Sequence, residues 1–125
     1  MAIDKLAMKR GTFFKGYQMT VATAAGDYVL NIPMTKDMYV NSMEFLNDDS
    51  GAGDLITIGH YESSAADAIL VSSIAETLYN PGPGRPYKME FPALEHLQEG
   101  HDLRVTYTNA GSVPIDHHTY VEFIK

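Results

Sequence analysis

The sequence predicts an all-β protein: an antiparallel β-sandwich, jelly-roll-like, with at most one short helix and an extended N-terminal arm. Seven segments alternate apolar and polar residues with a period of two, which is the pattern of half-buried strands. Gly, Pro, Asn and Asp separate these segments, and helices do not alternate with them as βαβ units would require. A length of 125 residues suits one domain with one core.

The N-terminus differs from the rest of the chain in charge and pattern. Four basic residues and one acidic residue give residues 1–15 a net charge of +3, whereas the remainder carries -10. Gly11 and Gly16 interrupt the short apolar pattern, so a stable helix is not expected there. We therefore expect residues 1–16 to form an arm and residues 17–125 to form a single sandwich domain.

The seven alternating segments follow the arm and define the expected strands. They cover residues 17–23, 28–32, 39–46, 55–61, 87–91, 103–108 and 119–123. In the third segment, the pattern places Tyr39, Met43 and Phe45 on one face. Glycine and Asx residues between the third and fourth segments predict a tight loop, because glycine adopts positive φ and Asx side chains bond nearby backbone.

Residues 64–79 break the alternation and leave two interpretations open. Four apolar residues recur there at four-residue intervals, and Ser64 and Asp67 are spaced like a capping box. A short helix is the first expectation for this segment. A strand over residues 69–74 is the alternative, and it would complete a set of eight strands.

Composition excludes several classes of protein. The chain has no cysteine, which excludes disulfide scaffolds, thiolate metal sites and cysteine nucleophiles. Its formal net charge of -7 would repel a phosphate backbone, so no nucleic-acid partner is expected. No apolar run approaches the roughly 20 residues that span a bilayer, and the N-terminus lacks a signal-peptide stretch. We therefore expect neither a membrane partner nor secretion by that route.

Two groups of residues are candidates for metal binding. Asp48, Asp49 and Asp54 could supply oxygen ligands to Ca²⁺, although their spacing differs from an EF-hand and also suits an ordinary solvated loop. His117 and His118 are adjacent, and neighbouring residues on a strand point to opposite faces. We expect hydrogen-bonded or solvent-facing histidines, with neither a metal site nor a cofactor.

Catalytic motifs are missing from the sequence. It contains no Gly-x-Ser-x-Gly nucleophile turn and no His-Glu-x-x-His zinc motif. The glycine-rich segment at residues 81–84 carries prolines where a phosphate-binding loop needs backbone N–H donors. The sequence therefore predicts a protein that is not an enzyme.

The layout resembles that of the small β-sandwich head-decoration, or cement, proteins of tailed bacteriophages. A basic N-terminal arm precedes an acidic sandwich without cysteine or catalytic motif, and the resemblance extends over the whole chain. It implies a non-catalytic virion protein that is made in the host cytoplasm and stabilises the outer capsid surface. It also implies a homotrimer whose partner is the major capsid protein. A lectin-like carbohydrate-binding module is the alternative function.

The arm combines positive charge with apolar side chains, which a partner would be expected to cover. The acidic body of a neighbouring copy or a capsid surface would accept it. We therefore predict that the arm crosses to another chain and that its contact residues are Lys9, Arg10, Phe13 and Phe14.

Overall fold

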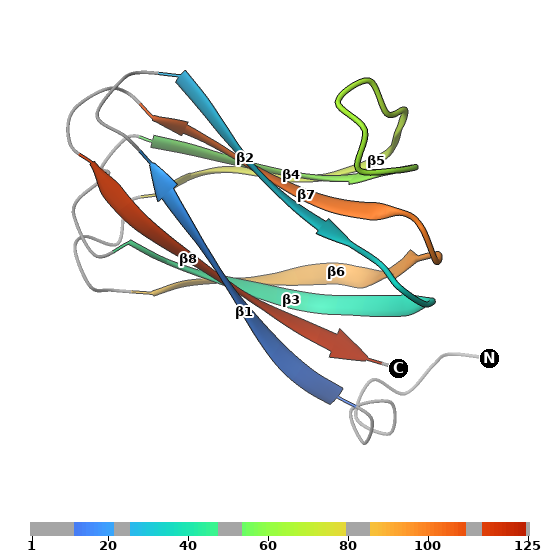
Figure 1. The fold of residues 1–125 in the computed structure, drawn as a ribbon. Coiled ribbons are helices and arrows are strands. Elements are labelled where there is room, and N and C mark those ends of the chain that lie inside the picture. The colour runs from blue at the N-terminus through green and yellow to red at the C-terminus, as the bar shows by residue number, and fades with distance from the viewer. Residues whose placement is uncertain (1–11, 22–25, 48–53, 80–85, 110–113, 125) are drawn as a thin grey trace.

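The computed structural model describes residues 12–21, 26–47, 54–79, 86–109 and 114–124, and they form two packed layers of strands (Figure 1). The strands are β1 (Thr12–Val21), β2 (Gly26–Pro33), β3 (Met38–Asn47), β4 (Asp54–Tyr61), β5 (Leu70–Tyr79), β6 (Tyr87–Leu97), β7 (Asp102–Asn109) and β8 (Ile115–Ile124). Within these ranges there is no helix, and hence none that is long and apolar enough to cross a membrane.

The strands form two four-stranded sheets with the orders β1-β8-β3-β6 and β2-β7-β4-β5. Neighbouring strands are antiparallel throughout both sheets. Successive strands alternate between the sheets except at the β4–β5 connection, and the first and last strands pair with each other. This order is that of a jelly-roll sandwich, so the predicted fold class is confirmed.

The core lies between the inner faces of the two sheets. Alternate residues of each strand point inward, which explains the period of two in the sequence. The buried apolar side chains include Ile32, Phe45, Ile56, Ile58, Leu103, Val105, Tyr107 and Val121. Their burial away from water is the main stabilising contribution to the fold.

The first strand begins earlier than the sequence predicts. β1 starts at Thr12, and Thr12–Val21 pairs residue by residue with β8. Residues 12–16 therefore belong to the sandwich rather than to the predicted arm, and residues 1–11 lie outside the described part of the chain. Gly16 did not end the strand because its partner on β8, Tyr120, covers it.

The helix predicted for residues 64–79 is wrong, and the alternative strand is confirmed as β5 (Leu70–Tyr79). A four-residue apolar interval fits one face of a helix, but it is also a multiple of two and so fits one face of a strand. Pairing with β4 decided between the two, with irregular register between Ile58 and Gly59 and between His60 and Tyr61.

The expected grouping of Tyr39 with Met43 and Phe45 is also wrong. The register of β3 shifts between Val40 and Ser42, so one extra residue reverses the facing of the strand. Met43 and Phe45 are buried in the core, whereas Tyr39 lies on the outer face and stacks on His96 with ring centroids 4.7 Å apart.

Candidate interaction surface

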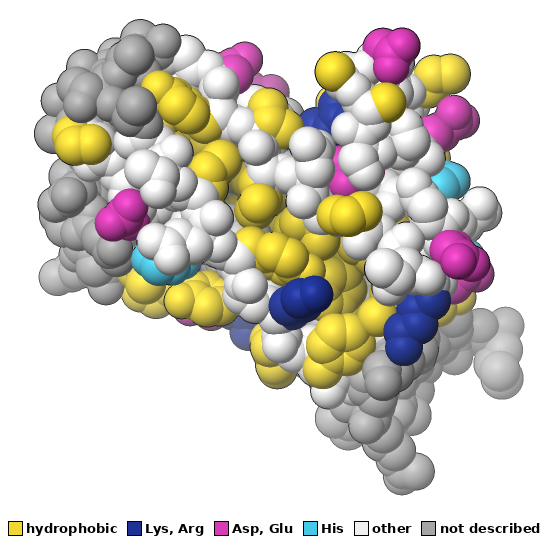
Figure 2. Space-filling model, viewed as in Figure 1, with side chains coloured by type: hydrophobic (Ala, Val, Ile, Leu, Met, Phe, Trp, Pro, Cys, Tyr) yellow, Lys and Arg dark blue, Asp and Glu magenta, His cyan; other side chains and the backbone are white. Residues whose placement is uncertain are grey.

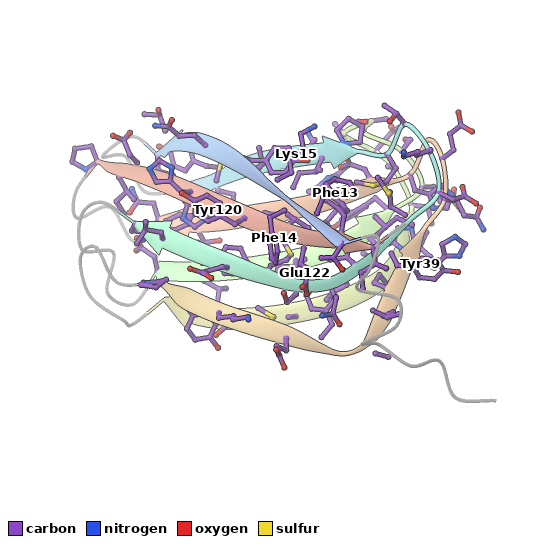
Figure 3. All side chains as sticks on the ribbon, turned by 90° about the horizontal axis from the view of Figure 1, so that it is seen from below. Phe13, Phe14, Lys15, Tyr39, Tyr120 and Glu122 are labelled. Carbon is purple, nitrogen blue, oxygen red and sulfur yellow. The ribbon has the colours of Figure 1, made fainter. Side chains whose placement is uncertain are left out.

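The outer face of the β1-β8-β3-β6 sheet presents aromatic side chains to solvent (Figure 3). On β1 and β8 the even-numbered residues point outward, so Phe14, Tyr120 and Glu122 share this face. Phe14 is 69% exposed and Tyr120 is 39% exposed. We call this face the outer aromatic face; its central residues are Phe14, Tyr39, Tyr120 and Glu122.

Gly16 positions the ring of Tyr120. The two residues are opposite each other in the β1–β8 register. A Cβ atom at position 16 would lie 3.1 Å from Cε1 of Tyr120, so any side chain there would push the ring away. The ring therefore covers the glycine and lies along the sheet, where it adds a flat apolar area beside Phe14.

Glu122 is a buried carboxylate at the centre of this face. It is 6% exposed, and its Oε1 atom accepts hydrogen bonds from Asn41 Nδ2 and from Ser42 Oγ at 3.0 Å. The β3 bulge brings both donors to one side, where they hold the carboxylate in place. Phe14 is opposite Glu122 in the register, so a fixed acidic group adjoins an exposed ring.

The remaining charged residues make the outer aromatic face acidic. Glu90 is opposite Ser42, and Glu44 is opposite both Tyr120 and Lys88. Lys88 Nζ lies 3.9 Å from Glu90 Oε1, a contact between exposed side chains that contributes little to stability. Such a face suits a partner that offers basic groups together with apolar side chains.

The predicted contact residues occupy different positions. Phe13 turns inward, packs against the core and stacks on Phe123 with ring centroids 5.3 Å apart. Phe14 points outward, as a partner contact requires. Lys9 and Arg10 lie outside the described residues. Both phenylalanines belong to β1 and not to an arm. They point in opposite directions because adjacent residues on a strand face opposite sides of the sheet.

Of the three aspartates proposed as calcium ligands, only Asp54 lies within the described part of the chain. Asp48 and Asp49 lie outside the described residues, whereas Asp54 is fully buried at the start of β4. Its Oδ2 atom accepts a 2.6 Å hydrogen bond from the Tyr107 hydroxyl. Asp54 thus belongs to an internal network and does not face a solvent loop. Across the described ranges, no three His, Asp or Glu residues are grouped so that they could hold a metal ion.

His117 continues this internal network into the other sheet. Asn47 donates from Nδ2 to the Tyr107 hydroxyl at 2.9 Å, and its Oδ1 lies 2.6 Å from His117 Nδ1. Thr119 Oγ1 lies 3.1 Å from the other ring nitrogen. Burial, together with the nearby charge of His118, lowers the pKa of His117 to about 4. His117 is thus buried, and both of its ring nitrogens have hydrogen-bond partners.

A second cross-sheet contact, at the opposite end of the strands, was not foreseen. His60 Nδ1 lies 2.9 Å from Glu95 Oε2, and His60 Nε2 lies 2.8 Å from His101 Nδ1. These residues are separated by 35 and 41 positions in the chain, so no local spacing signals their contact. The His60–Glu95 contact links β4 in one sheet to β6 in the other.

Comparison with known proteins is informative at the level of the fold. The sequence matches no protein-family profile, and no curated protein is significantly similar to it. Solved structures do match. They include infectious bursal disease virus of the Gx strain (TM-score 0.52, 14% identity) and of the Gt strain (TM-score 0.53, 12% identity). Each match covers 90% of this chain and 31% or 32% of the viral chain. The protein thus corresponds to about a third of the length of those chains.

A third match is to Bacillus endospore appendages, described as a family of disulfide-linked pili, with a TM-score of 0.45 and 13% identity. It covers 91% of this chain and 88% of the other. The strand order of its two sheets makes the protein an all-β, jelly-roll-like sandwich, and the matched viral chains share this fold.

Proposed function

We propose that the protein is a non-catalytic virion structural protein that binds the outer surface of a tailed-phage capsid as a cement, or decoration, protein. Its sandwich fold is similar to that of viral chains. A protein that clamps a lattice needs a rigid body and an exposed contact face, and it needs no catalytic group. The major capsid protein is the proposed partner, and the virion surface is the proposed location after synthesis in the host cytoplasm.

The observation that carries the proposal is the exposure of Phe14 and Tyr120 on a rigid sheet. Aromatic side chains dominate the binding energy of protein interfaces because they bury large areas at small entropic cost. Both residues lie on regular strands, and Tyr120 covers Gly16, so their positions are set before binding. The adjoining Glu122 accepts hydrogen bonds from Asn41 and Ser42 and so links β8 to β3 beside the exposed rings.

The basic N-terminal segment complements this acidic face. Residues 1–11 contain three basic residues and one acidic residue. We assign Lys9 and Arg10, together with Phe14, to contacts with a neighbouring subunit or with the capsid. The assembly proposed for these contacts is a homotrimer. Opposite charges would guide the encounter, and high salt would weaken it.

Co-sedimentation with purified capsids that lack the protein tests capsid binding. The double variant Phe14→Ala and Tyr120→Ala should bind at least about tenfold more weakly, since the centre of the contact loses two aromatic anchors. Val29→Ala is the matched control, because Val29 is 50% exposed on the other sheet. Equal binding by all three proteins would contradict the role of the outer aromatic face.

A deletion tests the N-terminal segment. Removing residues 1–11 leaves β1 intact, so the truncated chain should fold and yet lose attachment to capsids.

A glycan panel separates the two candidate functions. The carbohydrate-binding alternative instead requires binding to members of a glycan panel. Tight binding to glycans without binding to capsids would replace the cement proposal by that alternative.

A further inference from the structure

The connection from β4 to β5 forms an exposed apolar tip. Ile69 is 65% exposed, Leu70 is 48% exposed and Val71 is 49% exposed. Asp67 is the one charged residue among residues 65–71, which we call the β4–β5 tip. In Figure 2 the upper right of the molecule carries hydrophobic side chains around acidic ones, above the level of the sheet. Contiguous apolar surface of this kind marks an interaction site.

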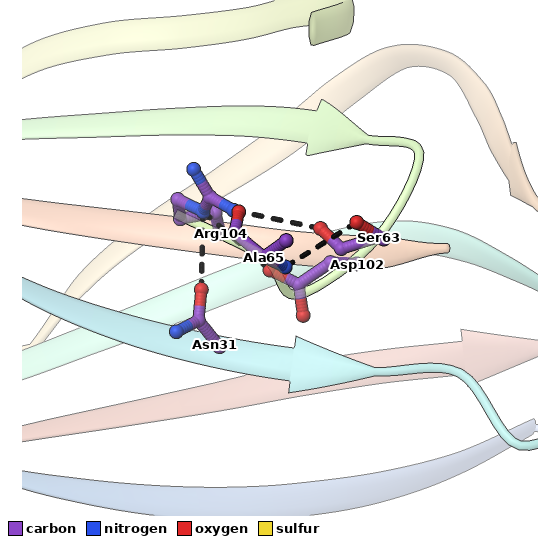
Figure 4. A network of polar contacts seen from close by, with 5 residues as sticks. All are labelled: Asn31, Ser63, Ala65, Asp102 and Arg104. Carbon is purple, nitrogen blue, oxygen red and sulfur yellow. Dashed lines mark hydrogen bonds and ion pairs between the residues drawn. The ribbon is translucent and has the colours of Figure 1, made fainter. Parts of the chain in front are cut away.

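Arg104 of β7 holds the tip in one conformation (Figure 4). Its Nη2 atom donates to the carbonyl oxygen of Ala65 at 2.9 Å, and its Nε atom donates to Asn31 Oδ1 at 3.0 Å. The guanidinium also lies 3.9 Å from the centroid of the Tyr61 ring. Within the loop, the amide of Glu62 donates to the carbonyl oxygen of Ile69 at 3.0 Å. The apolar side chains are thus presented by a braced loop, which lowers the entropic cost of binding.

A groove lined largely by apolar residues, with Lys15 and Thr35 among them, opens on another part of the surface, between the edge strands β1 and β2 of the two sheets. Its lining includes Phe13, Lys15, Tyr17, Met34, Met38 and Phe123. Figure 2 shows hydrophobic side chains in this gap between the sheets, with basic groups among them. Its volume is about 120 Å³. An apolar cavity of about 150 Å³ accommodates benzene, so this groove has room for one branched aliphatic side chain.

The tip and the groove are complementary in chemistry. The tip offers aliphatic side chains with a single acidic group, Asp67, and the groove offers an apolar floor with a basic group, Lys15. Lys15 Nζ lies 5.5 Å from the centroid of the Tyr17 ring and is exposed. We propose that the β4–β5 tip of one copy docks into the β1–β2 groove of the next copy. Ile69 fills the groove, and Asp67 pairs with Lys15.

This contact joins two different surfaces, so it is heterologous. When each copy makes the same contact with the next, the copies form either a closed ring or an open filament. A closed ring of any number of copies satisfies every tip and every groove, and the proposed homotrimer is one such ring. The proposal rests on the self-association part of the proposed function and not on capsid binding. Mass measurements without capsids therefore test it separately from the cement proposal.

Analytical ultracentrifugation of the full chain provides the test. The wild type should sediment as a closed ring, the proposed trimer. Ile69→Asp should weaken assembly at least about tenfold, because a carboxylate would replace an aliphatic side chain against Phe13, Met34 and Met38. Asp67→Lys and Lys15→Asp should each weaken assembly, and the double reversal should restore it. Ile69 is largely exposed, so its variant should fold, as circular dichroism can verify. Val29→Asp is the matched control and should still assemble.

Mixing defines the polarity of the contact. Ile69→Asp retains an intact groove, and Met34→Asp retains an intact tip, so the two variants should be monomers alone and form a one-to-one dimer together. Met34 is buried, so Met34→Asp can prevent folding. In that case Lys15→Asp replaces it as the variant with an altered groove. A monomeric wild type, no rescue by the double reversal, or no dimer on mixing would each overturn the proposal.

Discussion

Glu95 and His60 join the two sheets across the interior, with Glu95 Oε2 2.9 Å from His60 Nδ1. His60 is nearly fully buried, and its other ring nitrogen contacts His101. A buried ring N–H that loses its acceptor costs more than the hydrogen bond itself contributed, because its desolvation is no longer compensated. The contact therefore stabilises this end of the sandwich as long as both partners are present.

Removing the acceptor gives the first prediction. Glu95→Ala should lower the free energy of unfolding by roughly 1–3 kcal/mol, since the His60 N–H remains buried without a partner. Urea denaturation at neutral pH measures the change. Glu90→Ala, on the exposed face of the same strand, should change stability by less than about 0.5 kcal/mol. Equal losses for the two variants would show that the cross-sheet contact has no special role.

The buried imidazole of His117 should make the protein sensitive to acid. Its pKa in the folded state is lowered to about 4 from 6.5, so the unfolded chain binds a proton first as the pH falls. The contribution of His117 to stability is thus complete above about pH 6.5 and declines by roughly 3 kcal/mol down to about pH 4. His117→Gln should show a shallower decline across this window in urea denaturation at several pH values. Parallel curves would rule out His117 as the cause.

Asp102 should have the opposite pH dependence. Burial raises its pKa in the folded state to about 6, although Arg104 Nε at 3.6 Å favours the charged form. Neither carboxylate oxygen has a hydrogen-bond partner within the described part of the chain. The folded state therefore holds the extra proton between pH 3.8 and about 6, and this contribution to stability is lost as the pH rises through that interval.

The Asp102→Asn variant keeps the shape of the side chain and removes its charge. It should be more stable than the wild type at neutral pH, by roughly 1–3 kcal/mol, with the difference shrinking toward about pH 4. Thermal unfolding of both proteins across this range measures the difference. A variant that is less stable at neutral pH would mean that the ion pair with Arg104 outweighs the burial of the carboxylate.

The hydroxyl of Tyr107 connects Asn47 in one sheet to Asp54 in the other. Tyr107→Phe deletes this single group and leaves a buried amide and a buried carboxylate each with one partner fewer. Unfolding should cost roughly 1–3 kcal/mol less free energy than in the wild type. Tyr120→Phe makes the same chemical change on the outer aromatic face and should be close to neutral. An unchanged midpoint for Tyr107→Phe would contradict the structural role of the network.

Most strands could be predicted because alternation along the sequence reports burial directly. Val105 and Tyr107 point into the core while Arg104 and Thr106 point away, and the same rule holds for most of the eight strands. Prediction from alternation failed where the spacing of apolar or charged residues fitted two different structures. In β5 the four-residue intervals also fit a helix, and in β1 Lys15 suggested an arm, although it lines the open groove beside the core.

The candidate surface was only partly predictable. Phe14 was selected because an apolar residue beside basic ones suggests a covered contact, and the structure does place it outward. Glu122 was missed, because its donors Asn41 and Ser42 are 81 and 80 positions away in the chain. The β3 bulge that brings them together leaves no periodic signal, since it consists of one extra residue.

The fold class, the inward side of most strands and the acidic balance of the sandwich can be read from the amino-acid sequence, since each follows from local alternation or from composition. Which strands are neighbours and which polar groups meet depends on how the two sheets pack. Backbone hydrogen bonds between strands are the same for every residue type, so pairing over long separations is selected by packing of the whole core. Hence His60 meets Glu95, and Glu122 meets Asn41, through pairing that no local pattern records.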